Sequence, residues 1–314
     1  MSQFLKRFLL FILVLIVTDQ IIGFCLRQLY FSQHKGQFAQ TTYAIDSANQ
    51  DILIFGSSRA VRHYSTSILS NTYGKSCYNV GRDGQQIPYY VAVQDVIFGR
   101  KKPSMVILDI NTWEFSINPS RYEKLSILLP YCHKHPELVK YVELDNPFER
   151  YKLLSAIYPY NSSLFIAANN KIFENKIPSD DKGYDPIIRK MNQAGITYTK
   201  KIIAQAKIDN EKKQPKIDSL SYSLYRQFLQ KCVDAHIATY VVISPTIVPE
   251  TPNERKDKLL SITKEFPAVT FLDFSSSPNY NDHFEKFADI FHLNKEGSEE
   301  FTKELLVKIG KLPQ

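Results

Sequence analysis

The stretch that decides the fold is Asp51-Ile52-Leu53-Ile54-Phe55-Gly56-Ser57-Ser58-Arg59-Ala60. Its apolar run predicts a buried β-strand, and the glycine that follows predicts a sharp turn. Ser58 would then stand just past the end of a strand, where its hydroxyl could act as a nucleophile. The same letters also suit a turn followed by a helix N-cap, so the rest of the chain must decide between the two interpretations.

Strand and helix patterns alternate on the C-terminal side of this stretch, which predicts an α/β fold around a parallel sheet. Further strands are expected at residues 76–81, 103–110, 238–244 and 269–274, and helices at residues 63–69, 85–98, 217–232, 253–265 and 294–309. The apolar run at residues 105–108 is typical of a central strand that is buried on both faces. The alternation stops at about residues 116–215, which we interpret as a helical insertion, with helices near 137–144 and 147–173.

Composition bounds the class of protein. The 314 residues suffice for one large α/β domain with an insertion. The net charge is +7 and the pI is near 9.0, but the basic residues are spread along the chain without a nucleic-acid-binding motif, so no nucleic acid partner is expected. The four cysteines lack a CxxC spacing, and the adjacent Cys132 and His133 are a weak metal signal. We expect no metal and no cofactor.

The N-terminus carries a candidate membrane anchor. Lys6 and Arg7 precede an apolar run at residues 8–17, and apolar residues resume after Asp19 as far as residue 26. This span approaches the roughly 20 residues that cross a bilayer. A cleaved signal peptide is the alternative, but no small-x-small cleavage site follows the run. We therefore predict a cytoplasmic N-terminus and anchor at residues 1–30.

The anchor sets the expected organisation and location. Residues 31–50 are predicted to be a linker, and residues 51–314 a domain that contains the insertion. The positive charges before the apolar run place the N-terminus inside, so we expect a single-pass protein of the cell (inner) membrane with an extracytoplasmic or periplasmic domain. Asp19 is unusual, because a carboxylate at the centre of a membrane helix costs about 2.5 to 3.5 kcal/mol. It either contacts a partner membrane protein or is protonated or snorkels.

A second candidate for chemistry lies near the C-terminus, where Asp289 stands three residues before His292. In such a pair the carboxylate can hold the imidazole in one tautomer while its other nitrogen faces a nucleophile. The stretches around Ser58, Gly84 and Asn111 each follow a predicted strand, so they emerge at the carboxyl edge of the sheet, where open α/β sheets bind ligands. We expect the Asp289/His292 loop to meet them there.

This pattern resembles the SGNH, or GDSL, hydrolases. Gly56-Ser57-Ser58 matches the family's Gly-Asp-Ser, Asn79 to Gly84 matches the second block, Asn111 the third, and Asp289 with His292 the last. The resemblance implies a flavodoxin-like three-layer sandwich and a catalytic set of Ser58, Asp289 and His292. It also implies an oxyanion hole formed by Ser58, Gly84 and Asn111, with Gly81 as the alternative to Gly84.

Two departures, Ser57 for the usual Asp and Thr112 after Asn111, are similar to the membrane-anchored branch of this superfamily, which includes the alginate O-acetylation and teichoic-acid D-alanylation proteins. This similarity implies an esterase or O-acyltransferase whose substrate is an acylated saccharide or another ester. It also implies a multispanning membrane acyltransferase as a partner. Arg59, Trp113 and Glu114 are candidates for lining the pocket. The alternative function is an inactive SGNH-like scaffold that binds glycan or partners an acyltransferase.

Overall fold

The computed structural model describes residues 3–177, 180–210, 216–248, 250 and 253–311. The chain forms two compact units. One contains Met1–Ile45 and Pro119–Ser179, and the other contains Asp46–Asn118 and Asp180–Gln314. All the residues predicted to carry chemistry belong to the second unit, which we call the sheet unit. The first is called the N-terminal unit.

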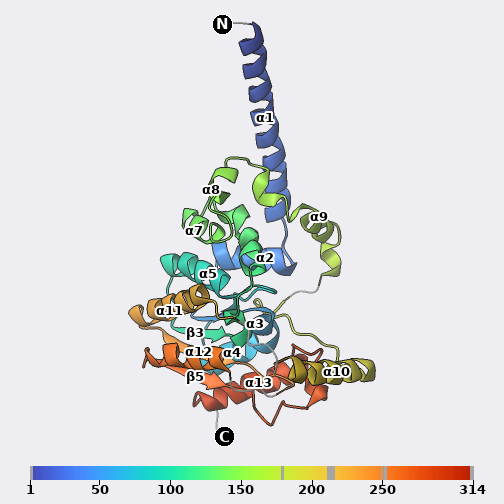
Figure 1. The fold of residues 1–314 in the computed structure, drawn as a ribbon, viewed down its shortest axis with the longest axis vertical. Helices are drawn as coiled ribbons and strands as arrows, with labels where there is room; N and C mark the ends of the chain where they lie inside the picture. Colours follow the sequence, from blue (N-terminus) through green and yellow to red (C-terminus); the bar gives the residue numbers. More distant parts are fainter. Residues whose placement is uncertain (1–2, 178–179, 211–215, 249, 251–252, 312–314) are drawn as a thin grey trace. The chain divides into compact units, whose positions relative to one another are not determined.

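The sheet unit is built on five parallel strands in the order β2-β1-β3-β4-β5. This is the flavodoxin-like order of a doubly wound sheet, so the predicted α/β fold class is confirmed. Two of the strands, β3 and β5, are labelled in Figure 1. The strands are β1 Ile52–Phe55, β2 Cys77–Asn79, β3 Met105–Asp109, β4 Ala238–Ile243 and β5 Val269–Asp273. Each lies within a predicted strand, because the buried apolar runs had marked them.

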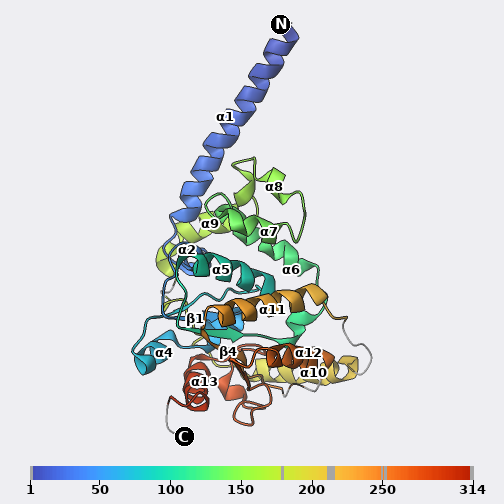
Figure 2. The same ribbon diagram turned by 90° about the vertical axis from the view of Figure 1, so that its left-hand side faces the viewer.

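Helices cover both faces of this sheet. Ile52 and Ile54 point to a core shared with Phe301 and Leu305 of α13, whereas Phe55 contacts Phe228 of α11 on the opposite face. Figure 2 shows α5 and α11 on one side of the sheet and α13 on the other. The helices of this unit are α3 Ser58–His63, α4 Thr66–Tyr73, α5 Ile87–Arg100, η1 Thr112–Phe115, α10 Gln193–Asn210, α11 Ser219–Asp234, α12 Glu254–Lys264, η6 Phe284–Lys286 and α13 Lys295–Lys308.

The turn after β1 requires glycine. Gly56 has φ of +148°, and a Cβ atom there would lie 2.8 Å from the carbonyl oxygen of Asp109. A side chain would therefore strain the backbone and collide with the end of β3. The close passage delivers Ser58 to the first position of α3.

Two short helices replace the single helix predicted at residues 63–69. The Ser57 side chain accepts from the N–H of Arg59 at 3.4 Å, and the Ser65 side chain accepts from the N–H of Ile68 at 3.4 Å. Two separate N-caps start α3 and α4. The sequence pattern had captured the second helix only, because α3 is polar and short.

The N-terminal unit consists of helices. They are α1 Gln3–Phe31, α2 Gly36–Asp46, α6 Ser120–Glu123, η2 Lys124–Tyr131, η3 Pro136–Leu138, α7 Val139–Val142, α8 Glu149–Lys152, η4 Tyr158–Tyr160, α9 Leu164–Ile172 and η5 Glu174–Lys176. By length and composition α1 could cross a membrane, and only 6% of its apolar window is buried, unlike a core helix.

The boundaries of the units differ from the predicted linker and insertion. The predicted linker contains α2, which forms because Phe38, Ala44 and Ile45 share a buried face. Residues 180–210, predicted as part of the insertion, belong to the sheet unit. The reason is packing, since Met191 and Ile203 lie against the core formed by β1, β3 and α13.

Candidate active site

Ser58 and His292 meet at the carboxyl edge of the sheet. Ser58 is the first residue of α3, and its Oγ lies 2.8 Å from Nε2 of His292, although 234 positions separate them in the chain. Both residues are partly exposed. The geometry is that of a hydroxyl beside a base that can remove its proton.

Asp289 fixes the other side of the imidazole. Nδ1 of His292 lies 2.9 Å from Oδ1 and 3.0 Å from Oδ2 of Asp289, so Nδ1 carries the proton and Nε2 is left to accept. Oδ1 also accepts from the backbone N–H groups of Phe291 and His292. Burial acts to raise the pKa of Asp289, but the hydrogen bonds from His292 and the Phe291 N–H outweigh it and lower the pKa.

A backbone hydrogen bond joins the two ends of the loop that carries Asp289 and His292. The N–H of Ala288 donates to the carbonyl of His292 at 2.9 Å. Asn294 caps α13 by accepting from the N–H of Gly297 at 3.0 Å, and its amide donates to the carbonyl of Glu285 at 2.6 Å. His292 is therefore held by a short rigid turn and not by a free loop.

Gly84 and Gly81 differ in what their N–H groups can do. The Gly81 N–H donates to Oδ1 of Asn79 at 3.0 Å. Gly84 is exposed and has φ of +73°, in the left-handed region that favours glycine. The neighbouring Asp83 is bound by Arg62 of α3 at 2.9 Å, which ties this loop to the helix that begins at Ser58. Gly84 remains the candidate donor, because the Gly81 N–H is engaged.

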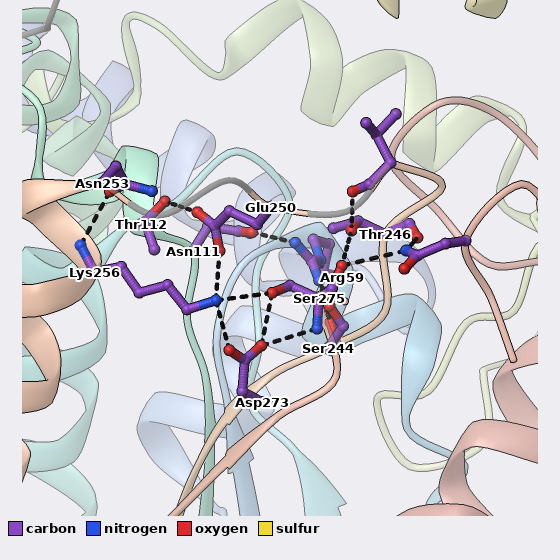
Figure 3. A network of polar contacts seen from close by, with 12 residues as sticks. Arg59, Asn111, Thr112, Ser244, Thr246, Glu250, Asn253, Lys256, Asp273 and Ser275 are labelled. Carbon is purple, nitrogen blue, oxygen red and sulfur yellow. Dashed lines mark hydrogen bonds and ion pairs between the residues drawn. The ribbon is translucent and has the colours of Figure 1, made fainter. Parts of the chain in front are cut away.

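Asn111 follows β3, and its amide has a defined orientation. Oδ1 accepts from the guanidinium of Arg59 (Figure 3), and arginine can only donate, so the amide group cannot be reversed. Its Nδ2 is buried and has no hydrogen-bond partner among the described residues. A buried donor without a partner is costly, so a free N–H at this position invites a ligand oxygen.

Arg59 and Glu114, predicted to line the pocket, lie in the interior. The guanidinium of Arg59 donates to Oγ of Ser244 from Nε at 3.0 Å and from a terminal nitrogen at 2.8 Å. Glu114 is fully buried and accepts from the N–H of Asn111 at 3.1 Å. In both cases the side chain points inward because neighbouring backbone groups there need a hydrogen-bond partner. Of the three candidates, Trp113 has an exposed side chain, at 49%.

A polar network continues from Asn111 toward β5 (Figure 3). The Thr112 hydroxyl donates to Glu250, and Lys256 binds Asp273 at 2.5 Å and the Ser275 hydroxyl at 3.1 Å. Burial acts to raise the pKa of Asp273, but Lys256 and Ser275 outweigh it and lower the pKa. These contacts fix the segments that follow β3 and β5 near the site.

Three comparisons with known proteins bear on identity. No family model matches the sequence, and no curated protein matches it significantly. The fold is similar to a Streptococcus pneumonia protein described as a candidate platelet activating factor, with a TM-score of 0.40 and 11% identity over 98% of this chain and 100% of that chain. It is also similar to an acetyl xylan esterase, with a TM-score of 0.36 and 11% identity over 82% of this chain and 99% of that chain. These likenesses are loose, so the function is argued from the side chains.

His63 and Ser244 form a buried layer beneath the site that sequence reasoning missed. His63 is fully buried, and its Nε2 accepts from the N–H of Leu293, beside His292, at 3.0 Å. Its Nδ1 therefore carries the proton and donates to Oγ of Ser244 at 3.0 Å. Burial, followed by the charge of Arg59, lowers the pKa of His63 well below its usual range. Ser244 follows β4 at the same edge as Ser58 and Asn111, and that position was the available signal.

Asp109 ends β3 in the same layer. Its Oδ2 accepts from the hydroxyl of Tyr64 at 2.5 Å, and burial raises its pKa even though Arg59 acts to lower it. Among the described residues, no three His, Cys, Asp or Glu side chains gather as metal ligands, and all four cysteines are free.

Proposed function

We propose that this chain is an SGNH-type serine esterase or O-acyltransferase that acts on acyl esters. The observation that carries the proposal is the 2.8 Å separation between Ser58 Oγ and His292 Nε2, with Asp289 on the opposite nitrogen. Three residues in this order of contact form a hydroxyl, its base and the carboxylate that orients the base.

The reaction proceeds through an acyl-serine. Nε2 of His292 takes the Ser58 proton as Oγ attacks the ester carbonyl carbon, and the imidazolium that forms is stabilised by Asp289. The protonated His292 then gives this proton to the departing alcohol as the carbon–oxygen bond of the ester breaks. Water completes hydrolysis, or a sugar hydroxyl accepts the acyl group. His292 removes the proton of either acceptor.

The oxyanion of the tetrahedral intermediate is held by the N–H groups of Ser58 and Gly84 and by Nδ2 of Asn111. The unpartnered state of Nδ2 supports this role, as does the engagement of the Gly81 N–H elsewhere. Arg59 contributes indirectly, because its bond to Oδ1 fixes the orientation of the Asn111 amide and leaves the donor Nδ2 available. Donors fixed in advance are worth more than donors that must reorganise.

The enzyme is anchored in the cell membrane by α1, with its N-terminus in the cytoplasm and the sheet unit outside. The length and apolar surface of α1 support this, and Lys6 and Arg7 at its start set the orientation. From this location the substrates are acylated saccharides of the cell envelope, and a multispanning membrane acyltransferase is a partner that would supply acyl groups.

A fluorophosphonate probe tests the chemistry, because it reacts only with a serine that its own site activates. The full chain in detergent should be labelled at Ser58, and Ser58→Ala and His292→Ala should abolish the labelling. Ser57→Ala and His283→Ala, which change the neighbouring serine and an exposed histidine, should leave it intact. Absence of labelling in the wild-type chain would reject the enzyme and favour the scaffold.

A further inference from the structure

The carboxylate of Asp19, inside the apolar part of α1, is bound by the protein's own chain. Its two oxygens accept from the hydroxyl of Ser155 at 2.6 Å and from the backbone N–H groups of Ala156 at 2.7 Å and Ile157 at 3.4 Å. One turn further on, a Cβ at Gly23 would lie 2.4 Å from Cβ of Ala156, so the loop and α1 are in close contact. The loop at residues 155–157 is therefore fixed at the level of Asp19.

The length of the apolar stretch sets the depth of that level. Residues 8–26 span roughly 28 Å as a helix, which matches the roughly 30 Å of a hydrocarbon core. Residues 8–18 alone would span roughly 16 Å, about half of what is needed. The outer boundary of the lipid must therefore lie near residue 26, roughly 10 Å beyond Asp19. A loop bonded to Asp19 then lies below that boundary.

The surface around this loop has the composition that lipid would require. Five large apolar or aromatic side chains are exposed on or next to α8, at the start of α9 and beside the loop, and we call them the collar: Phe148 (64%), Tyr151 (62%), Leu154 (82%), Phe165 (85%) and Ile166 (55%). α9 and η4 pack on α1, and Figures 1 and 2 both show α8 at the height of the C-terminal part of α1. Such a concentration of exposed apolar side chains is rare on a surface that faces water.

Leu154 of the collar directly precedes the loop that contacts Asp19 and Gly23, so it lies at the level of the exposed apolar side chains of α1 there. Ile21 and Phe24 of α1 are exposed at 60% and 61%. Arg150 and Lys152 flank Tyr151 and form ion pairs with Glu143 and Glu149. The apolar surface therefore extends outward from α1, with charge at its rim.

We propose that the N-terminal unit enters the outer leaflet, with the collar in contact with acyl chains and the loop at residues 155–157 satisfying Asp19 within the lipid. This inference rests on the proposed role of α1 as a membrane span. It makes the unit a lipid-embedded base and not a water-exposed insertion. Asp19 then has an internal partner and needs no second membrane protein.

Quenching by brominated lipids tests the collar in the full chain reconstituted into phosphatidylcholine vesicles. Trp113 is the single tryptophan, so Trp113→Phe gives a silent background. In that background Leu154→Trp and Phe165→Trp, whose side chains are exposed and tolerate a larger ring, should lose most of their emission when the acyl chains carry bromine. Glu123→Trp, at an exposed polar position of α6 in the same unit, should keep its emission.

Val14→Trp in α1 separates this inference from the anchor on which it rests. Quenching of Val14→Trp without quenching of Leu154→Trp and Phe165→Trp would overturn the collar and leave the anchor standing. Emission that is unchanged in all three would overturn both.

A second measurement avoids substitution. A lipid-soluble diazirine photolysed in vesicles that hold the unchanged chain should label residues 148–154 and 164–166 together with α1. Labelling of α1 alone would contradict the collar.

Discussion

The rings of His63 and His292 lie 6.3 Å apart and nearly perpendicular, yet their surroundings differ. His292 is partly exposed, with a carboxylate on one nitrogen and a hydroxyl on the other. His63 is fully buried between the Ser244 hydroxyl and the Leu293 N–H. Burial in the second arrangement keeps the His63 ring neutral. In the proposed mechanism the same side chain thus serves as a base in the outer layer, with Ser58 and Asp289, and as a structural support in the inner layer, with Ser244.

The largest effect in the outer layer, which consists of Ser58, His292 and Asp289, is expected at the carboxylate of Asp289. Asp289 accepts from Nδ1–H of His292. In Asp289→Asn the amide N–H can donate to an unprotonated Nδ1, which favours the tautomer with the proton on Nε2. We expect turnover to fall by about 10⁴-fold with the fold intact. The rate of p-nitrophenyl acetate hydrolysis measures this loss.

Asp282→Asn is the matched control for that substitution. Asp282 is exposed and has φ of +62°, a conformation that asparagine also adopts. The turnover of the Asp282→Asn variant should therefore equal that of the wild type. Equal losses in the two variants would show that Asp289 has no special role.

The link between the layers is tested at Asn111. Asn111→Asp keeps an oxygen for Arg59 but replaces the donor Nδ2 with a carboxylate oxygen that repels an oxyanion, so the network should survive while turnover falls by at least about 10² to 10³-fold. Measurement of turnover together with the thermal midpoint separates the two effects. Unchanged turnover would remove Asn111 from the oxyanion hole. A fall in turnover accompanied by a large fall in the thermal midpoint would indicate a structural role.

The inner layer is tested by the pH dependence of stability. Burial lowers the pKa of His63 in the folded chain, so below the unfolded value of 6.5 the unfolded chain binds a proton that the folded chain excludes. Stability is therefore complete above pH 6.5 and falls on acidification, by up to about 1.36 kcal/mol per pH unit.

His63→Gln should remove this pH-dependent loss while costing about 1 to 3 kcal/mol at neutral pH, since one buried partner is left unsatisfied. Unfolding monitored by circular dichroism at pH 7.5 and pH 5.5 measures both quantities. A variant that loses stability with acid as steeply as the wild type would show that His63 takes up a proton in the fold.

The smallest effect is expected at Ser57. Its side chain caps α3, so Ser57→Ala should lower the free energy of unfolding by about 0.5 to 2 kcal/mol. Turnover should stay close to that of the wild type, because Ser57 makes no described contact with His292. Ser57→Asp, which restores a capping oxygen and the residue usual in SGNH hydrolases, should recover stability. A large loss of turnover in Ser57→Ala would mean that the wrong serine has been chosen.

The sheet and the outer layer could be predicted because both follow from local patterns. Buried apolar runs mark the strands, and parallel strands bring Ser58, Gly84 and Asn111 to one edge whatever the details of packing. The loop that carries Asp289 and His292 is then expected at the same edge.

The inner layer could not be predicted, because it depends on how α3 is rotated about its axis. From the sequence, Arg59, Arg62 and His63 are equally polar neighbours of Ser58. In the structure Arg59 and His63 face the interior, while Arg62 binds Asp83 and Asp185 near the surface. The partner of Asp19 was equally hidden, since Ser155 lies 136 positions away.

The separation of 234 positions between Ser58 and His292 has a consequence for biogenesis. At about 5 to 20 residues per second, the ribosome adds His292 roughly 12 to 47 seconds after Ser58. During that interval the Ser58 hydroxyl is an ordinary alcohol with no base beside it. In the proposed mechanism, reactivity would begin only when the segment carrying Asp289 and His292 docks against α3, so a nascent chain would not acylate itself on esters that it meets during synthesis.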